Sequence, residues 1–479
     1  MQLKKLLKFI RLKREYDTDD TKTSLDKDND LSFSTYMLSK FNVSSSIITI
    51  HLGIDFGTSY TKVCFRQLET EETEVIYLNN GDKFGFIESA VKLDGLKIIT
   101  PFDENWGDSS KQIIKIDNLK MILLDKSFTE VNYSAEKMKT IVIFFLAKVI
   151  QQVRLSFIEQ QAELCFNKMI KWSASIGVPV KYFDSDEIPI FQNILNIAWN
   201  LSEVRNLPDS VLEVSELINK AKYQTAVNNV ECYAVPEVVA AICSFMKSQA
   251  AMENIYIFMD IGGGTFDITS FCLIDHMGEK QINILDTQIE PLGIKIFINK
   301  YAYAVNDDWD ENSEQIKKNV EKCLFNPGRD THKLPDCHWE QGEEDIKKLV
   351  AKAIMYAKDA DDKHWFSNMK ELHIFLGGGG SESPWYKETI NRTYVNRKLK
   401  NAGIPQFYFQ TMGVPDDFHL DEQHVQYFHR YAVAYGLSCP YEYPQIIGYP
   451  RVNPKIDKSK ESRKFDYDSI AIDKYGKIL

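Results

Sequence analysis

Two short segments of the sequence have almost the same pattern. Ile54–Thr58 (IDFGT) and Met259–Gly263 (MDIGG) each follow one apolar run and lead into another. A strand that ends in Asp-x-Gly and continues at once into a second strand predicts a hairpin with a glycine turn. Because internal repetition constrains a fold strongly, the two copies predict a duplicated α/β unit with one such hairpin in each half.

The rest of the sequence alternates strand patterns with helix patterns, which predicts α/β layers. Strands are expected at 47–54, 61–65, 173–178, 254–260, 266–272, 281–288 and 372–376. Helices are expected at 135–167, around 188–201, at 314–324 and at 343–357. The last of the strands ends in four glycines, Gly377 to Gly380.

Composition indicates a folded protein with more than one unit. A chain of 479 residues is too long for one compact core. Its net charge of -11 argues against broad contact with a phosphate backbone, so no nucleic acid partner is expected. The 8 cysteines include no CxxC pair, which is typical of a reducing compartment. No apolar stretch approaches the roughly 20 residues that cross a bilayer, so we expect a cytoplasmic protein.

The first residues form a basic amphipathic pattern. The apolar positions with helical spacing are Leu3, Leu6, Leu7 and Ile10. A helix over residues 1–14 could lie peripherally on an anionic membrane, or it could dock on a partner protein or on the protein's own acidic surface. Residues 17–30 are polar and lack apolar periodicity, so we expect a flexible linker and a folded body that begins near Ile47.

The residue types in the two hairpins suit a nucleotide with a metal ion. Glycines in a turn let backbone N–H groups approach phosphate oxygens, because no Cβ stands in the way. An Asp at the strand end can orient the waters around Mg²⁺, which usually keeps several of them. Thr58, Ser59 and Thr265 add hydroxyl donors at the turns. One copy alone could be a plain tight hairpin, but two copies favour a shared phosphate site.

The sequence contains neither GxxxxGK[ST] nor GxGxxG, so the usual phosphate-loop and dinucleotide folds are disfavoured. It resembles instead the actin-like ATPases, which include actin, the seventy-kilodalton heat-shock chaperones, sugar kinases and bacterial segregation actins. Gly53–Phe65 (GIDFGTSYTKVCF) is similar to the first phosphate motif of this superfamily. Met259–Phe271 (MDIGGGTFDITSF) is similar to the second and is the more specific match. The closest likeness is to the nucleotide-binding domain of the heat-shock chaperones.

Further segments recur in the order found in that superfamily. Asp117–Met121 resembles the stretch that carries the chaperones' catalytic lysine, here Lys120. Pro236–Ala241 resembles the connecting segment whose glutamate reaches the metal waters, here Glu237, although Val238 stands where a proline usually follows. The other similar segments are Ala174–Pro179 before a long helix, Leu292–Gly293, Leu376–Ser381 as the adenosine motif, and Ala432–Gly436 as the helix that returns to the first domain.

The resemblance implies a site for ATP or ADP with Mg²⁺ between the two halves. The implied catalytic residues are Asp260, Lys120, Glu237 and Asp55, and the two aspartates would hold the metal mainly through water. The residues implied to bind the nucleotide are Gly57, Thr58, Ser59, Tyr60, Gly262, Gly263, Gly264, Thr265, Gly378, Gly379, Gly380 and Ser381. Hydrolysis would then depend mostly on positioning and on charge neutralisation.

Several charged residues also have plainer explanations. Lys120 could be a lysine on a solvated helix face, and Glu237 could be a carboxylate at a helix N-terminus. Asp267 could be a hydrogen-bonding residue within a strand. After the adenosine glycines, Glu382 and Ser383 occupy the place where the chaperones have an Arg that packs on the base, so adenine selectivity is less supported than phosphate binding. The charged helix at 314–324 could line a base pocket or could be solvated.

The resemblance also implies the domain organisation. Residues 47–247 would form one actin-like, ribonuclease H-like domain, completed by a returning helix at about 421–440, and residues 248–420 would form the second. Residues 1–46 precede them. Residues 441–479 form a C-terminal extension rich in Tyr, Lys, Asp and Pro, which is expected to be irregular or to bind a partner. This extension is too short for a separate peptide-binding domain.

Four functions fit this outline. The leading hypothesis is an ATPase that closes on Mg-ATP, changes its binding to an unidentified protein partner and is reset by hydrolysis. The second is a filament-forming protein of the bacterial actin type, which would self-assemble and use the basic helix as a membrane tether. The third is a small-molecule kinase, although the sequence shows no acceptor-site signature. The fourth is a nucleotide-binding protein without turnover, which the presence of Asp55, Lys120 and Asp260 argues against.

Overall fold

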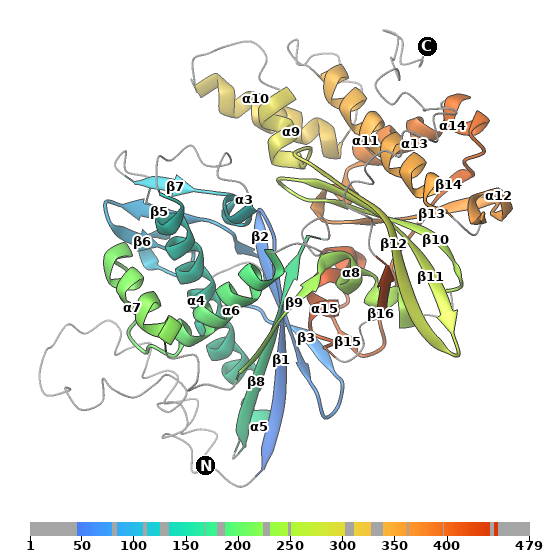
Figure 1. Cartoon of the computed structure of the whole chain (residues 1–479). Helices are drawn as coiled ribbons and strands as arrows, with labels where there is room; N and C mark the ends of the chain where they lie inside the picture. Colours follow the sequence, from blue (N-terminus) through green and yellow to red (C-terminus); the bar gives the residue numbers. More distant parts are fainter. Residues whose placement is uncertain are drawn as a thin grey trace, which may run out of the picture.

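The computed structural model of the chain describes two large sheets with their helices (Figure 1). The described residues are 46–78, 84–108, 113–124, 134–166, 168–179, 187–223, 230–247, 251–301, 311–326, 339–361, 364–395, 397–440 and 445–448. The helix predicted at 1–14, the linker at 17–30 and most of the extension at 441–479 lie outside the described residues. The described part is a mixed α/β fold, as the alternating pattern predicts.

The first sheet is built around β1 (Ile47–Phe56), an apolar strand whose last seven residues are all buried. β1 pairs antiparallel with β2 (Tyr60–Gln67) and parallel with β8 (Met169–Val178). The other strands of this seven-stranded sheet are β3 (Thr73–Val75), β4 (Ile87–Glu88), β9 (Glu231–Pro236) and β15 (Phe418–His419). The order is β15-β3-β2-β1-β8-β9, with β4 beside β2. β1 is apolar on both faces because it lies at the centre of a covered sheet.

The second, six-stranded sheet has a similar arrangement around β10 (Asn254–Ile261). β10 pairs antiparallel with β11 (Phe266–His276) and parallel with β13 (Glu371–Gly377). The remaining strands are β12 (Glu279–Glu290), β14 (Gln406–Gln410) and β16 (Gln445–Gly448). The order is β14-β13-β10-β11-β12-β16. In both sheets, the strand that carries the predicted Asp lies between its hairpin partner and a parallel strand.

Long helices cover the first sheet. α4 (Ala135–Gln160) and α6 (Glu187–Ser202) pack against each other, and α7 (Val211–Tyr223) contacts both. α4 begins at Ser134, whose hydroxyl accepts a hydrogen bond from the Lys137 N–H at 3.3 Å. Among the described helices, α4 is long and apolar enough to cross a membrane, and 83% of its most apolar stretch is buried inside the fold. That burial explains its composition.

The second sheet has its own helices. α11 (Trp339–Asp359) packs on β11 and β12, and α13 (Pro384–Val395) packs on α11 and on α10 (Glu311–Phe325). α9 (Ile294–Tyr301) contacts α10 and α11. The shorter helices are η5 (Gly379–Glu382), α12 (Trp365–Asn368), α14 (Arg397–Asn401) and η6 (Val425–Arg430). η5 begins within the run of four glycines, because β13 ends at Gly377 and Gly378 caps the helix.

A small three-stranded sheet extends the first half. Its order is β6-β5-β7, and its strands are β5 (Val91–Asp94), β6 (Lys97–Ile99) and β7 (Ile114–Ile116). It leads into α3 (Leu119–Leu124), the short helix that carries Lys120. The other short helices of this half are η1 (Glu104–Gly107) and α5 (Ala162–Cys165).

Two helices lie between the large sheets, α8 (Glu237–Lys247) and α15 (Ala432–Leu437) (Figure 1). They approach closely because Gly436 has no side chain: a Cβ there would lie 1.9 Å from the Ala240 carbonyl oxygen. α15 also crosses β1 at Gly53, where a Cβ would lie 2.3 Å from a carbonyl oxygen of α15. The two glycines therefore set the spacing of α15, α8 and the first sheet.

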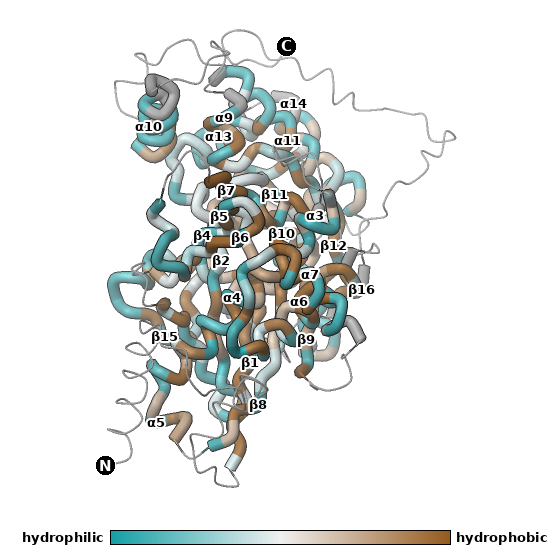
Figure 2. Tube along the Cα trace, turned by 90° about the vertical axis from the view of Figure 1, so that its left-hand side faces the viewer, coloured by the Kyte–Doolittle hydropathy of each residue, from teal (hydrophilic) through white to brown (hydrophobic). Residues whose placement is uncertain are grey.

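The apolar interior continues from one half to the other. Each half has its own core, and a third core joins both sheets through α8 and α15. In this third core, the Phe245 ring of α8 lies 4.6 Å, centroid to centroid, from the Phe375 ring of β13. Figure 2 shows apolar residues along many of the strands inside the molecule, whereas α10 at the periphery is mostly hydrophilic. The two halves therefore share buried surface.

Two short strands depart from the sequence expectations. Within the C-terminal extension, for which the sequence predicts an irregular or a partner-binding segment, Gln445–Gly448 form the strand β16 and pair with β12. β15 lies within the range predicted for the second domain, yet it pairs with β3 of the first sheet. Both strands add to the edge of a sheet, where unpaired N–H and C=O groups attract a further strand.

The crossing of the two central helices gives a first prediction. We expect Gly436→Ala to destabilise the protein by about 2 kcal/mol or more, because the added methyl group must push α15 away from α8. Gly413→Ala is the matched control, since its Cβ would meet nothing within 4 Å. Urea midpoints of the full-length variants measure the difference. Equal midpoints for Gly436→Ala and Gly413→Ala would contradict the close crossing.

Candidate functional site

The two glycine turns lie against each other, although they belong to different sheets. A Cβ on Gly263 would lie 1.8 Å from the Ser59 Oγ atom. A Cβ on Gly264 would lie 2.6 Å from the methyl carbon of Thr58. Side chains of the first turn therefore occupy the space that the glycines of the second leave free. This contact brings the ends of β1 and β10 together at the junction of the two halves.

A cavity of about 370 Å³ opens where the two turns meet. Its walls come from both sheets, α3, α8, α9, α10, η5 and η6. Of the residues that the resemblance implies, those in the lining are Asp55, Gly57, Thr58, Ser59, Tyr60, Lys120, Glu237, Asp260, Gly262, Gly263, Thr265, Gly378 and Gly379. The structure therefore brings together most of the predicted residues, which are far apart in the sequence.

Three implied residues lie outside the cavity lining, and each shapes a glycine turn. Gly264 packs on the first turn, and Gly380 is buried against the side chain of Ile261. The Ser381 hydroxyl donates a hydrogen bond to the Gly378 carbonyl oxygen at 2.7 Å. These residues contact the turns rather than the cavity.

Two lysines contact carboxylates inside the cavity. The Lys62 Nζ donates to Asp55 Oδ2 at 2.6 Å, and the Lys120 Nζ forms a close ion pair with Glu237 Oε1. Lys120 is only 6% exposed, so its explanation as a lysine on a solvated helix face is wrong. Although burial opposes it, the charge of Glu237 raises the pKa of Lys120, and the amine stays protonated. Glu237 does begin α8, so it is both a helix N-terminal carboxylate and the partner of Lys120.

Asp260 and Asp267 form an acidic wall on the second sheet. They are directly opposite each other in the β10–β11 register, so their side chains share one face of the hairpin. Burial, followed by the charges of Glu237 and Asp55, raises the pKa of Asp260 to about 6. Burial and the charge of Asp260 raise the pKa of Asp267 to about 8. The Oδ1 atoms of both aspartates are enclosed and have no hydrogen-bond partner.

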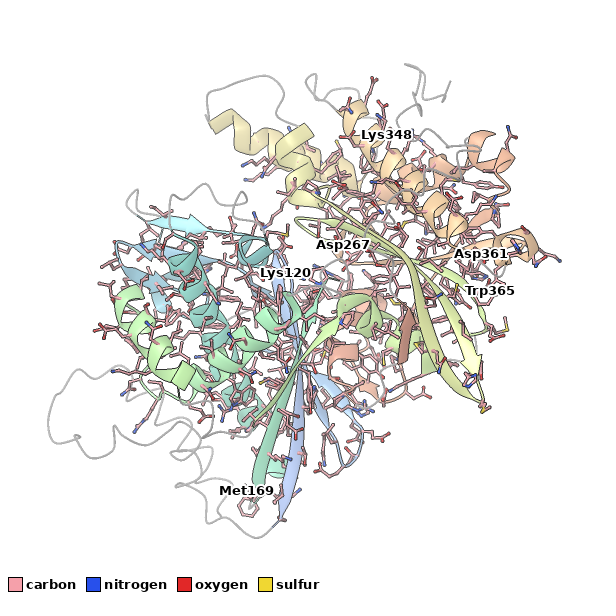
Figure 3. All side chains as sticks on the ribbon, in the orientation of Figure 1. Lys120, Met169, Asp267, Lys348, Asp361 and Trp365 are labelled. Carbon is pink, nitrogen blue, oxygen red and sulfur yellow. The ribbon has the colours of Figure 1, made fainter. Side chains whose placement is uncertain are left out.

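Figure 3 shows where two of the charged residues of the cavity lie. Lys120, from α3, and Asp267, from β11, lie at the junction of the halves in this view. Burial and the charges of Asp260 and Glu237 raise the pKa of Asp267, and the charge of Lys120 partly offsets this rise. The cavity is therefore a cluster of carboxylates and lysines enclosed by glycine turns.

The donor set fits a divalent cation bound together with phosphate. Besides Glu321 and Glu382, four carboxylates line the cavity: Asp55, Glu237, Asp260 and Asp267. Lys62 and Lys120 pair with two of them, which leaves oxygen atoms of the other two unsatisfied. A divalent ion near these oxygens would offset the burial and the repulsion that raise their pKa values. In the described part of the chain, no three His, Cys, Asp or Glu side chains are grouped closely enough to surround an ion by themselves.

Sequence reasoning left several lining residues unassigned. Lys62 did carry a signal, because a residue directly opposite Asp55 in a hairpin must share its face. Glu321 lies on the charged helix that was a candidate for a base pocket. The unassigned lining residues are Met121, Pro179, Asp267, Ile289, Ile294, Lys295, Phe325, Glu382, His429, Arg430 and Val433. Ile294, Lys295, Phe325, His429 and Arg430 are placed by the packing of α9, α10 and η6, which no motif specifies.

One further wall of the cavity is formed by η5 and η6. The His429 Nε2 lies 3.2 Å from Glu382 Oε1, and the Arg430 Nη1 lies 3.6 Å from the same oxygen. Although burial opposes it, the His429 hydrogen bond and the Arg430 charge lower the pKa of Glu382. The Arg430 guanidinium also lies 4.3 Å from the centroid of the Phe86 ring, within cation–π range. Arg430 thus contacts both halves.

Comparison with known proteins does not assign the chain to a family. No protein-family model matches the sequence, and no curated protein shows significant similarity to it. The function therefore has to be argued from the residues and geometry of the cavity.

The raised pKa values predict how stability depends on pH. Because the pKa values of Asp260 and Asp267 are raised in the folded protein, both carboxyl groups keep their protons to a higher pH than in the unfolded chain. The stability that this proton binding contributes is fully present below about pH 4, and it is lost as the pH rises through the folded pKa values. We expect Asp267→Asn, which cannot ionise, to gain about 1–3 kcal/mol relative to the wild type between about pH 5 and about pH 8.5.

Urea denaturation of the ligand-free protein at the two pH values measures this gain. Asp94→Asn is the control, since Asp94 is exposed and its substitution should shift stability equally at both pH values. A pH-independent difference between Asp267→Asn and the wild type would contradict the raised pKa.

Proposed function

We propose that the protein binds Mg-ATP between its two halves and hydrolyses it to ADP and phosphate. On this proposal, the two sheets and their helices are the duplicated actin-like, ribonuclease H-like domains of an actin-like ATPase, similar to the nucleotide-binding domain of the heat-shock chaperones. The observation that carries the proposal is the meeting of the two Asp-Gly hairpins at one cavity that also holds Lys62 and Lys120. Phosphates need both the glycine backbone and the cations.

The glycine turns and the lysines would bind the phosphates. Backbone N–H groups of glycine-rich turns suit phosphate oxygens, and the hydroxyls of Thr58, Ser59 and Thr265 stand at the same turns. A lysine ammonium has three donors, so Lys62 and Lys120 can each keep a carboxylate partner while donating to a phosphate oxygen. Their positive charge would offset the charge of the triphosphate.

The carboxylates would arrange the hydrolytic water. Mg²⁺, when bound, supplies charge neutralisation across the phosphates. Asp55 and Asp260 would hold its water shell, and the unpartnered oxygens of Asp260 and Asp267 can accept hydrogen bonds from an attacking water. A bond then forms from the water oxygen to the terminal phosphorus while the bond to the ADP oxygen breaks. The water proton passes to a buried carboxylate or to the phosphate product.

Nucleotide binding would also favour one arrangement of the two halves. A ligand that contacts both turns binds better when the turns are together, so it shifts the population toward the closed form. Movement of one sheet relative to the other must pass through α8 and α15, which pack between them. We propose that this movement changes the affinity for a protein partner. Filament formation and phosphoryl transfer to a small molecule are alternative outcomes that the experiments below distinguish.

The proposal predicts the effect of removing the second hairpin's carboxylate. We expect Asp260→Asn to lower phosphate release from saturating Mg-ATP by about 100-fold or more, because the water and metal shell lose their charged acceptor. Asp275→Asn, at the exposed far end of β11, is the control and should keep wild-type turnover.

Product analysis completes this experiment. ADP and free phosphate in equal amounts support hydrolysis, whereas ADP without free phosphate in the presence of a phosphoryl acceptor would indicate a kinase. Sedimentation with ATP tests filament formation. Turnover of Asp260→Asn equal to that of the wild type would reject the proposed role of the hairpin.

Lys62 allows a separate test of phosphate binding. We expect Lys62→Gln to weaken ATP binding by about tenfold, because a charge-assisted hydrogen bond to phosphate is lost. AMP binding should change little if Lys62 contacts the outer phosphates. Lys97→Gln, in the small three-stranded sheet, is the control. Equal losses for ATP and AMP would show that Lys62 acts on the fold rather than on the phosphates.

A further inference from the structure

Residues 411–431, here called the strap, connect the edges of the two large sheets. The strap follows β14, the edge strand of the second sheet, and within a few residues it forms β15, the edge strand of the first. It continues into η6, which lies against β13, and then into α15. One continuous segment therefore touches both sheets and one of the central helices.

One end of the strap contributes to the cavity. His429 and Arg430 line the cavity, and both contact the Glu382 carboxylate of η5. Arg430 packs on the Phe86 ring of the first half, and the hydroxyl of Tyr431 donates to the Phe84 carbonyl oxygen at 2.9 Å. A ligand in the cavity would meet Glu382 and Arg430 and would change the contacts that hold this end.

At the other end of the strap, next to the β15–β3 pairing, one carboxylate makes three side-chain hydrogen bonds. Asp417 Oδ2 accepts hydrogen bonds from Arg66 of β2 and from Lys247, the last residue of α8, each at 2.8 Å. Asp417 Oδ1 accepts from the hydroxyl of Tyr435 in α15 at 2.8 Å. We call Asp417, Arg66, Lys247 and Tyr435 the hub. It ties the strap to the first sheet and to both central helices.

Packed rings fill the space between the two ends. Phe418 lies 5.7 Å from Phe428 and 5.2 Å from Tyr435, measured between ring centroids. The Phe86 ring, on which the Arg430 guanidinium packs, lies 5.5 Å from the Tyr431 ring, measured between centroids. Because closely packed side chains cannot move independently, a displacement at one end of the strap has a path to the other.

We propose that the strap couples the cavity to the hub, so that a change in the Glu382–Arg430 contact alters how Asp417 holds α8 and α15. The strap would then be the element through which an occupied cavity is communicated to the interface between the halves. Coupling of this kind is reciprocal, because each end must affect the other by the same free energy. That reciprocity makes the proposal testable without any ligand.

The test compares hydrogen exchange in four full-length, ligand-free proteins: wild type, Glu382→Gln, Asp417→Asn and Asp416→Asn. Glu382→Gln removes the charge at the cavity end, and Asp417→Asn removes it at the hub. Asp416→Asn makes the same change one residue away at an exposed position, so it is the matched control.

We expect each substitution to act at both ends. Glu382→Gln should speed exchange at Phe418–His419 and at the end of α8, and Asp417→Asn should speed exchange in η6, each by about fivefold or more. Asp416→Asn should leave hydrogen exchange unchanged at both ends of the strap. If each substitution affects only its own end, the proposal is rejected. If Asp417→Asn does not fold, Tyr435→Phe is used instead, because it keeps the ring and removes the two hub hydrogen bonds of the hydroxyl, to Asp417 and from Lys247. Faster exchange in η6 of Tyr435→Phe then supports the coupling, and unchanged exchange rejects it.

A second arm adds Mg-ATP and is the only one that rests on the proposed function. Equilibrium titration first establishes whether ATP binds; without binding, the proposed function fails and the ligand-free arm alone decides on the strap. With binding, ATP should slow exchange at both ends in the wild type and Asp416→Asn, but only at η6 in Asp417→Asn. An unchanged hub response in Asp417→Asn would contradict the coupling.

Discussion

The contact between the two glycine turns is the constraint on which the rest of the structure depends. The sheets could pack in many ways, but the approach of Gly263 to Ser59 fixes the ends of β1 and β10 beside each other. Any Cβ at this point would separate the halves, and the carboxylates near the ends of these strands, Asp55 and Asp260, would no longer face one cavity. The absence of side chains in the turns thus determines where the charged side chains meet.

The cavity concentrates charge that would destabilise an ordinary interior. Ion pairs hold Asp55 and Glu237, whereas burial and the neighbouring charges raise the pKa of Asp260 to about 6 and that of Asp267 to about 8. Buried groups with shifted pKa values and unsatisfied oxygens are typical of functional sites, where the arrangement that the chemistry needs lowers the stability of the fold. The two apolar cores and the shared third core supply the stability that tolerates this cluster.

The sequence was informative where function depends on short local patterns. Each strand–Asp–Gly turn is encoded by residues that are adjacent in the sequence. The pattern alone therefore located Asp55, Asp260 and their glycines without a structure. Lys62 could also have been found, because hairpin register places it opposite Asp55. The duplication of the whole unit remains a prediction, supported by the similar strand pairing around β1 and β10.

Other features depend on packing that no local pattern encodes. Glu382 and Arg430 meet because the strap crosses from one sheet to the other, and neither residue belongs to a recognisable motif. β15 and β16 are too short for alternation to reveal, and their pairing depends on free sheet edges nearby. The placement of α15 on β1 has a consequence for biosynthesis. His51 of β1 contacts the Leu437 carbonyl oxygen at 3.2 Å, so the first sheet is covered by residues that are synthesised 386 positions later. On the ribosome, the first half would emerge with one apolar face uncovered, and its folding would be completed only after the second half has been synthesised.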